Sequence, residues 1–138
     1  MDTLSSSSVK MFYPSLVKRL QAMMVDFLIL LSLFSLISLM IGEIGEVAPW
    51  VRASIFLGII CLYEPLLVAF TGGTLGHKLF HIRIVSADDS QRNISFIKAV
   101  IRILIKSALG WISFLTVTAN AQKQAIHDMA SGSLVIIR

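Results

Sequence analysis

The sequence predicts an all-α membrane protein with two transmembrane helices, a re-entrant or interfacial third helical segment, and a small cytoplasmic two-stranded β element. Three observations support this fold class. The 138 residues are 56% hydrophobic and 14% charged, with a mean hydropathy of +0.82, which is more apolar than a soluble domain requires. Two long apolar runs carry one charge each. Two short segments downstream have the residue pattern of β-strands.

The first predicted transmembrane helix covers residues 22–41, after a Ser-rich stretch at residues 1–12 that we expect to be flexible. Asp26 is the only charge in this helix. At a rise of about 1.5 Å per residue, the segment is long enough for the roughly 30 Å hydrocarbon core of a bilayer. Residues 42–49 contain two glutamates, two glycines and a proline and therefore form a short connection. Their acidic character places this connection on the external side.

The second predicted transmembrane helix covers residues 53–70. Glu64 is its only charge, and Pro65 is its only helix-disturbing residue. A glycine-rich turn follows, and apolar and polar residues then alternate over residues 79–85. A period of two indicates a strand with one apolar and one polar face.

Basic residues gather on one side of this helical hairpin. The connection holds two glutamates and a single nearby arginine, whereas the side with both chain ends is rich in cations. The positive-inside rule makes that side the cytoplasm, so we expect a cytoplasmic N-terminus. The cations concerned are Lys10, Lys18, Arg19, Lys78, Arg83, Arg92 and Lys98.

Residues 94–120 predict amphipathic or re-entrant helices rather than a straight crossing. Only residues 107–119 are free of charge, and Gly110 interrupts this stretch, which is shorter than the roughly 20 residues that a crossing requires. We therefore expect a break near Gly110. A basic residue recurs at every fourth position before it and predicts a basic stripe at the membrane surface, formed by Lys98, Arg102 and Lys106.

The C-terminal residues 133–138 are β-branched, follow a glycine and have the length of a strand. An isolated strand is unstable, so its expected partner is the other predicted strand at residues 79–85. Pairing would place both strands, and the C-terminus, in the cytoplasm, and the segment between them could not cross the membrane once. The alternative is a third crossing over residues 102–119, with Arg102 and Lys106 reaching toward the headgroups.

Asp26 is the strongest indication of a functional site, because an ionised carboxylate in hydrocarbon costs at least about 2.5–3.5 kcal/mol. It needs a partner, a polar cavity or a bound proton. Arg19 lies two helical turns earlier on the same face, but the rise of about 10 Å between them requires a third group. Glu64 lies at a similar depth in the second helix, so the two carboxylates could share a proton or a cation. Glu64 could instead be structural, satisfying a carbonyl freed by Pro65.

The sequence does not favour an enzyme, a cofactor or a metal site. His127 and Asp128 are adjacent, but no nucleophile in a pocket is evident, and Asp128 could instead accept backbone N–H groups or pair with Arg19. His77 and His81 fall where the alternation indicates a strand, so they do not share a helix face as metal ligands. The basic residues lie beside apolar runs, so we expect the lipid bilayer, and not nucleic acid, as their partner.

Three ordered motifs resemble the RDD family of small bacterial integral membrane proteins. They are Arg19 with Asp26, residues 72–85 (GGTLGHKLFHIRIV) and residues 123–136 (KQAIHDMASGSLVI). The resemblance covers residues 13–138, which we expect to form one RDD membrane domain. The family is named for one arginine and two aspartates, which correspond to Arg19, Asp26 and, most plausibly, Asp128. This sequence departs from the family pattern at His77 and Met129, where basic residues are usual.

The resemblance implies a multi-pass protein of the bacterial cytoplasmic (inner) membrane. It also implies two alternative functions. Some members are similar to antiporters that exchange protons for monovalent cations; here Asp26 would carry the proton, Arg19 would balance its charge, and Glu64 could be a second site. Two spans cannot enclose a pathway, so this hypothesis requires a homo-oligomer. An RDD domain also occurs in a eukaryotic membrane-bound degradation complex, which implies the alternative, a membrane-embedded interaction or assembly module that recruits a partner protein.

Overall fold

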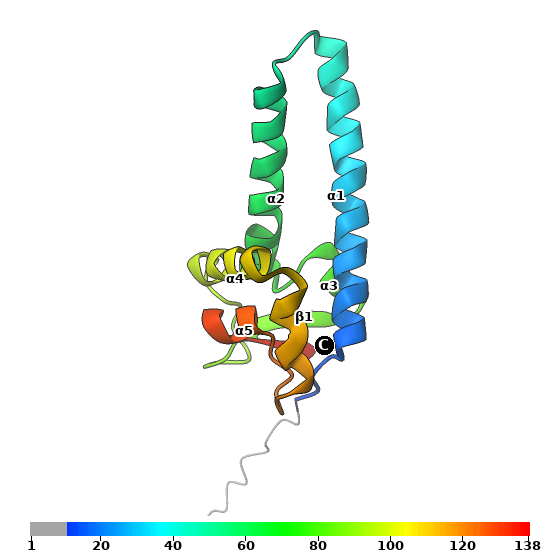
Figure 1. The fold of residues 1–138 in the computed structure, drawn as a ribbon. Coiled ribbons are helices and arrows are strands. Elements are labelled where there is room, and N and C mark those ends of the chain that lie inside the picture. Colours follow the sequence, from blue (N-terminus) through cyan, green and yellow to red (C-terminus); the bar gives the residue numbers. More distant parts are fainter. Residues whose placement is uncertain (1–10) are drawn as a thin grey trace, which may run out of the picture.

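The computed structural model describes residues 11–138, so residues 1–10 of the predicted flexible N-terminus, Lys10 included, lie outside the described part. A long helical hairpin carries a group of short elements at one end (Figure 1). The hairpin consists of α1 (Leu16–Ile44) and α2 (Pro49–Thr71). We call the other elements the head: α3 (Leu75–Leu79), β1 (Ile82–Ser86), α4 (Phe96–Leu109), η1 (Gly110–Thr118), α5 (Ile126–Ser131) and β2 (Ser133–Ile137).

Both hairpin helices are longer than predicted, because local signals extend them. Ser15 caps α1 by accepting a hydrogen bond from the backbone N–H of Lys18, so the helix begins six residues before the predicted residue 22. Pro49 occupies the first turn of α2, where its missing N–H costs nothing, and Gly72 ends the helix in the left-handed conformation at φ 79°. Serine hydroxyls that face outward on both helices donate to carbonyls four residues earlier, as an apolar surrounding requires.

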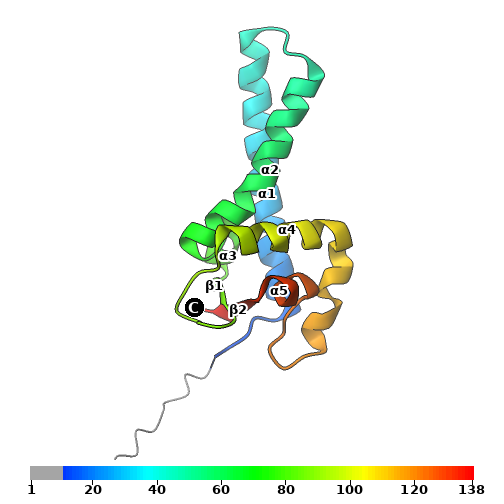
Figure 2. The ribbon, with the colours of Figure 1, turned by 90° about the vertical axis from the view of Figure 1, so that its left-hand side faces the viewer.

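Within residues 11–138, three helical stretches are long and apolar enough to cross a membrane: α1, α2 and Phe96–Thr118. The sequence predicted two, and the third stretch is not straight. Gly110 adopts φ 55° and separates α4 from the 3₁₀ helix η1, which confirms the predicted break. Figure 2 shows α4 running across the end of the hairpin, with η1 turned away from the hairpin.

The two predicted strands pair, as expected from the sequence. β1 and β2 form an antiparallel pair in which Ile82 faces Ile137 and Ile84 faces Val135. β1 starts three residues later than predicted, because the short helix α3 and His81, at φ 55°, take up the preceding residues. One apolar core joins the sheet to α1, α2 and α4, and it contains Ala22, Val68, Ile82, Ile84, Ile94, Ala99 and Val135.

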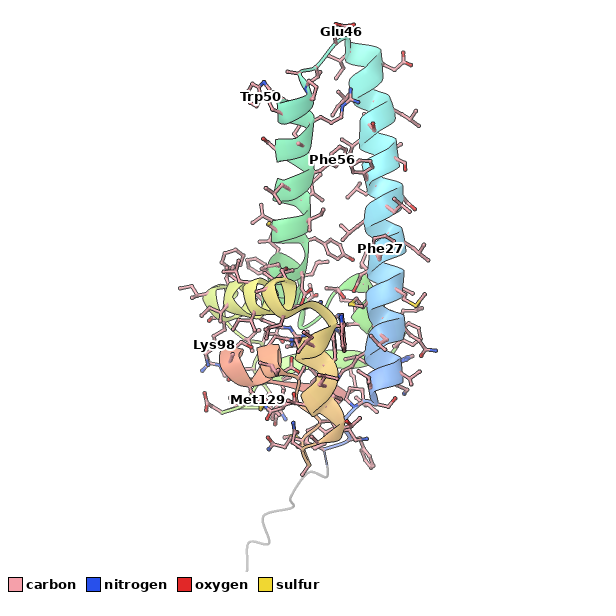
Figure 3. The ribbon with its side chains drawn as sticks, in the orientation of Figure 1. Phe27, Glu46, Trp50, Phe56, Lys98 and Met129 are labelled. Atoms are coloured by element: carbon pink, nitrogen blue, oxygen red, sulfur yellow. The ribbon has the colours of Figure 1, made fainter. Side chains whose placement is uncertain are left out.

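Side chains divide the molecule into an apolar shaft and a mixed head (Figure 3). Phe27 and Phe56 lie along the hairpin, and Glu46 and Trp50 lie near its far tip. Lys98 and Met129 lie on the head. Large apolar side chains along α1 and α2 remain exposed, which suits a surface that faces lipid.

Candidate functional site

Five charged side chains of alternating sign meet where the head joins the hairpin. Arg19 comes from α1, Glu64 from α2, Arg102 and Lys106 from α4, and Asp128 from α5. We call them the charge cluster. Ion pairs connect them in the order Arg19, Asp128, Arg102, Glu64, Lys106. The alternation lets each buried charge contact one of opposite sign, which buried ions require.

Asp128 lies at the centre of the charge cluster and is completely buried. Its Oδ2 accepts a hydrogen bond from Arg19 Nη1 at 2.5 Å, and its Oδ1 accepts one from Arg102 Nη1 at 2.5 Å. Oδ2 also accepts the backbone N–H of Ala125 at 3.0 Å and so caps α5. Burial alone would raise the pKa of this carboxyl, but the two guanidinium groups hold the pKa of Asp128 below its ordinary value. The predicted pairing of Arg19 with Asp128 is therefore present.

Arg102 and Lys106 both bind the carboxylate of Glu64. Lys106 Nζ donates to Glu64 Oε2 at 2.6 Å, and Arg102 Nε donates to Oε1 at 3.4 Å. Arg102 is only 3% exposed. The predicted basic stripe at the membrane surface is therefore wrong for these two residues: Lys98 is the member that reaches outward, toward Asp88. The spacing did place all three on one helix face, but buried carboxylates, and not headgroups, attract two of them.

Asp26 forms a second polar centre with a different set of partners. Tyr63 donates its hydroxyl to Asp26 Oδ1 at 2.9 Å, and the backbone N–H of Gly76 donates to the same oxygen at 2.8 Å. Thr74 Oγ1 lies 2.5 Å from Oδ2. All three donors are uncharged, and the His77 ring stands 3.8 Å away. Asp26 with these four residues is called the Asp26 site below.

The structure does not bring the predicted partners of Asp26 to it. Within residues 11–138, no ion pair or hydrogen bond joins Asp26 to Arg19 or to Glu64. Arg19 is held elsewhere, by Asp128 and by the carbonyl oxygen of Lys123 at 2.5 Å. Two helical turns separate Arg19 from Asp26, so one guanidinium cannot serve both.

Thr74 connects Asp26 to His77. Its Oγ1 forms short contacts both with Asp26 Oδ2 and with His77 Nδ1. A hydroxyl has one proton, so it can donate to only one of these neighbours and must accept from the other. Burial is the largest cause that lowers the pKa of His77, to about 3, so the ring is neutral near pH 7. A neutral imidazole can either donate or accept at Nδ1, according to its tautomer.

His127 is also fully buried, next to the charge cluster. Its Nδ1 forms a short hydrogen bond with Ser113 Oγ, and its Nε2 lies 3.4 Å from Asp128 Oδ1 without a hydrogen bond. Burial and the charge of Arg102 lower the pKa of His127 to about 3. Ser113, His127 and Asp128 resemble a nucleophile triad in order, but none of the three is exposed, so a substrate has no access to the hydroxyl.

Four residues of the Asp26 site were not expected there from the sequence: Tyr63, Thr74, Gly76 and His77. Only Thr74 carried a signal, because a threonine three residues before a potential helix donor is a common N-cap, and it does cap α3 by accepting from the backbone N–H of His77. In the part of the chain that the structure describes, no group of three or more His, Cys, Asp or Glu side chains could hold a metal ion.

The protein-family model described as the RDD family matches residues 13–132 of the chain. No curated protein and no solved structure matches the chain. The match contains every residue of the charge cluster and of the Asp26 site.

Proposed function

This chain belongs to the RDD family, and from that membership we propose proton-coupled exchange of monovalent cations across a bacterial inner membrane as its function. The hairpin would cross the bilayer with the head in the cytoplasm, because the described cations lie mainly on the head and Glu46 of the connection lies at the far tip (Figure 3). Both termini would then be cytoplasmic. The bent stretch of α4 and η1 would lie at the inner surface without crossing, which keeps the paired strands β1 and β2 on one side.

One observation carries this proposal: Asp26 is held by neutral donors alone. The carboxylates of the charge cluster are already neutralised by arginine and lysine. Asp26 receives its hydrogen bonds from two hydroxyls and one backbone N–H, and it is 9% exposed. A buried carboxylate without a cationic partner is stabilised by taking up a proton or a cation. Asp26 is therefore the group that exchanges one for the other.

Thr74 and His77 provide a route for the proton. In one state Asp26 is ionised, Thr74 donates to it, and His77 Nδ1–H donates to Thr74. In the other state Asp26 is protonated and donates to Thr74, which donates to the bare Nδ1 of His77, whose Nε2 then carries the ring proton. Passage from the second state to the first moves one proton from Asp26 to Thr74 and one from Thr74 to Nδ1, while Nε2 releases its own.

The same oxygens could hold the cation after the proton has left. The carboxylate of Asp26 and the hydroxyl oxygens of Tyr63 and Thr74 converge within hydrogen-bond distance, and oxygens of this kind suit a hard cation. A single hairpin cannot enclose a pathway across the bilayer, so the exchanger would be a homo-oligomer.

The variant Asp26→Asn tests the exchange function. The protein is reconstituted in vesicles that contain a pH-sensitive dye. A sodium or potassium gradient should change the internal pH of these vesicles. D26N should abolish this change while its folded yield is retained. Glu43→Gln, at an exposed residue near the tip of the hairpin, is the matched control and should exchange normally. Exchange by D26N at the normal rate would refute the role of Asp26.

A second function is favoured by a separate observation, the complete pairing of the charge cluster. A buried network that joins α1, α2, α4 and α5 holds the head rigidly against the hairpin. A rigid head that presents the half-exposed side chain of Lys98 on α4 could recruit a partner protein. In that case D26N should lower the folded yield, and no gradient should drive proton movement in the unmodified protein. Under both hypotheses we propose that the chain is not an enzyme, since Ser113 and His127 are sealed from solvent.

A further inference from the structure

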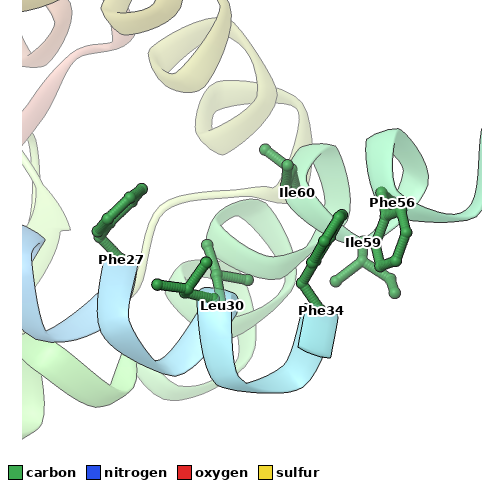
Figure 4. A pocket seen from close by; sticks show the side chains of 7 residues that line it. Phe27, Leu30, Phe34, Phe56, Ile59 and Ile60 are labelled. Atoms are coloured by element: carbon green, nitrogen blue, oxygen red, sulfur yellow. The ribbon is translucent and has the colours of Figure 1, made fainter. Parts of the chain in front are cut away.

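An apolar cleft lies between the two hairpin helices (Figure 4). It has a volume of about 410 Å³ and is lined from α1 between Phe27 and Phe34 and from α2 between Phe56 and Ile60. Figure 4 shows these side chains around the opening, with Phe34 and Phe56 next to each other. Their ring centroids are 3.6 Å apart, so this pair bridges the helices at the outer end of the cleft.

Two further hollows lie on the tip side of the ring pair, and both are lined by a cation. A second hollow is lined by Phe34 and Phe56 together with Arg52, and a third, nearer the tip, is lined by Arg52 and Glu46. Arg52 Nε is buried and has no hydrogen-bond partner, and within residues 11–138 no ion pair involves Arg52, although Glu46 is close in sequence. A buried N–H without a partner is costly, and a guanidinium favours phosphate or carboxylate oxygens.

The depth of this groove matches one leaflet. Trp50, 72% exposed, lies two residues from Arg52, and tryptophans of transmembrane helices favour the headgroup level. Ile60 lies eight residues beyond Arg52, a rise of about 12 Å in an α-helix, and one leaflet contributes about 15 Å of hydrocarbon. An apolar groove that starts at a cation in the headgroup region and extends through most of one leaflet has the form of an anionic lipid.

A helix from a second copy fits this cleft less well. A helix with its side chains is about 10–12 Å across, so two turns of it would occupy about 850–1,200 Å³. The cleft offers at most about half of that volume, which suits a slender flexible chain. A helix would also leave Arg52 without an anion, unless it supplied a carboxylate at this depth.

We propose that the hairpin binds one anionic phospholipid from the leaflet at its Trp50 end, with the phosphate on Arg52 and one acyl chain between α1 and α2. The chain passes beside the Phe34–Phe56 pair and ends near Phe27, one residue from Asp26. This lipid site does not depend on the exchange function.

Quenching of a tryptophan in the cleft by brominated lipid tests the site. Trp50 and Trp111 are replaced by phenylalanine, and Phe56→Trp introduces the reporter; Phe34→Trp, on the facing wall, replaces it if the first variant folds poorly. The full chain is reconstituted in phosphatidylcholine with rising fractions of acyl-brominated phosphatidylglycerol or acyl-brominated phosphatidylcholine. We expect half-maximal quenching at an about tenfold lower fraction of phosphatidylglycerol, because its headgroup carries a net negative charge beside Arg52, whereas choline cancels the phosphate charge of phosphatidylcholine.

Arg52→Gln should remove this preference, so that both brominated lipids quench equally. Arg92→Gln, which removes an exposed positive charge from the head, should leave it intact. Equal quenching by the two lipids with Arg52 present would show ordinary lipid contact and overturn the proposal. Absence of quenching by either lipid would show that protein fills the cleft, and would overturn it as well.

Discussion

Arg19 and Asp128, which are 109 residues apart in the chain, are joined by a buried ion pair with an N–O distance of 2.5 Å. Arg19 lies in the first turns of α1 and Asp128 in α5, so this contact fixes the last helix of the head to the first helix of the hairpin. Asp128 also binds Arg102, and therefore one carboxylate separates two buried guanidinium groups.

Removal of that carboxylate should destabilise the fold strongly. Asp128→Asn leaves Arg19 and Arg102 buried without a counter-ion, and loss of one partner of a buried pair costs about 3–5 kcal/mol. Unfolding of the purified protein in detergent, followed by circular dichroism, should show this loss. Asp88→Asn is the control, because its side chain is 88% exposed. A D128N protein as stable as the parent would show that the charge cluster contributes little.

Glu64 and Lys106 should be coupled energetically. Their 2.6 Å contact is partly shielded from solvent, and contacting residues in one network show interaction energies of about 0.5–3 kcal/mol. A double-mutant cycle with Glu64→Gln and Lys106→Met measures this term, and the double variant should be more stable than the sum of the two single losses predicts. Additive losses would mean that the contact is energetically neutral.

Gly76 should not tolerate a side chain. A Cβ at this position would lie 2.1 Å from the backbone oxygen of Ala22 and 2.8 Å from Asp26 Oδ2, so α3 would have to move away from α1. Gly76→Ala should therefore cost about 1–3 kcal/mol or more of stability and disturb the Asp26 site. Gly58→Ala in α2 has open space around its Cβ and should be neutral or slightly stabilising. Thermal unfolding of both variants in the same detergent measures this difference in stability.

The proton route predicts a difference between two substitutions at Thr74. Thr74→Val keeps the shape but removes the hydroxyl, and it should slow proton exchange about 100-fold, the scale of one lost proton-transfer group. Thr74→Ser restores the hydroxyl and should recover most of the rate. Thr118→Val, at an exposed hydroxyl of η1, should have no effect. Equal rates for T74V and T74S in the vesicle assay would exclude Thr74 from the route.

Stability should fall as the medium becomes acidic, because His77 and His127 are buried in the neutral form. The pKa of each lies at about 3 in the folded chain, below the ordinary value of 6.5, so the unfolded chain binds more protons between these values. Stability is full above pH 6.5 and decreases toward pH 3 by about 1.4 kcal/mol per pH unit for each ring. Melting temperatures at pH 7 and pH 5 measure the effect. The double variant His77→Gln, His127→Gln should show a smaller pH dependence.

Apolar run length and strand pattern were sufficient to predict the hairpin, the paired strands and the break at Gly110. These features depend on local sequence and on a small number of possible partners. The pairing of Arg19 with Asp128 was one of two options that the residues allowed. The environment of the basic face of α4 was not predictable. Arg102 and Lys106 have the same four-residue spacing whether that face meets headgroups or buried carboxylates.

The Asp26 site was beyond prediction for a different reason. Tyr63, Thr74 and His77 are neutral residues without periodic spacing. The docking of α3 against α1 brings Thr74 and His77 to the carboxylate, whereas Tyr63 reaches it from α2. The contact between Gly76 and Ala22 that permits this docking is a tertiary event. A sequence shows which charges need partners, but the partners themselves depend on how the short elements pack.

The distance in sequence between Arg19 and Asp128 has a consequence for biogenesis. At a synthesis rate of about 5–20 residues per second, Arg19 leaves the ribosome about 5–20 s before its counter-ion is made. The first helix is therefore complete while its guanidinium still lacks a counter-ion, until translation reaches α5. A nascent chain interrupted before that point would keep Arg19 without its counter-ion.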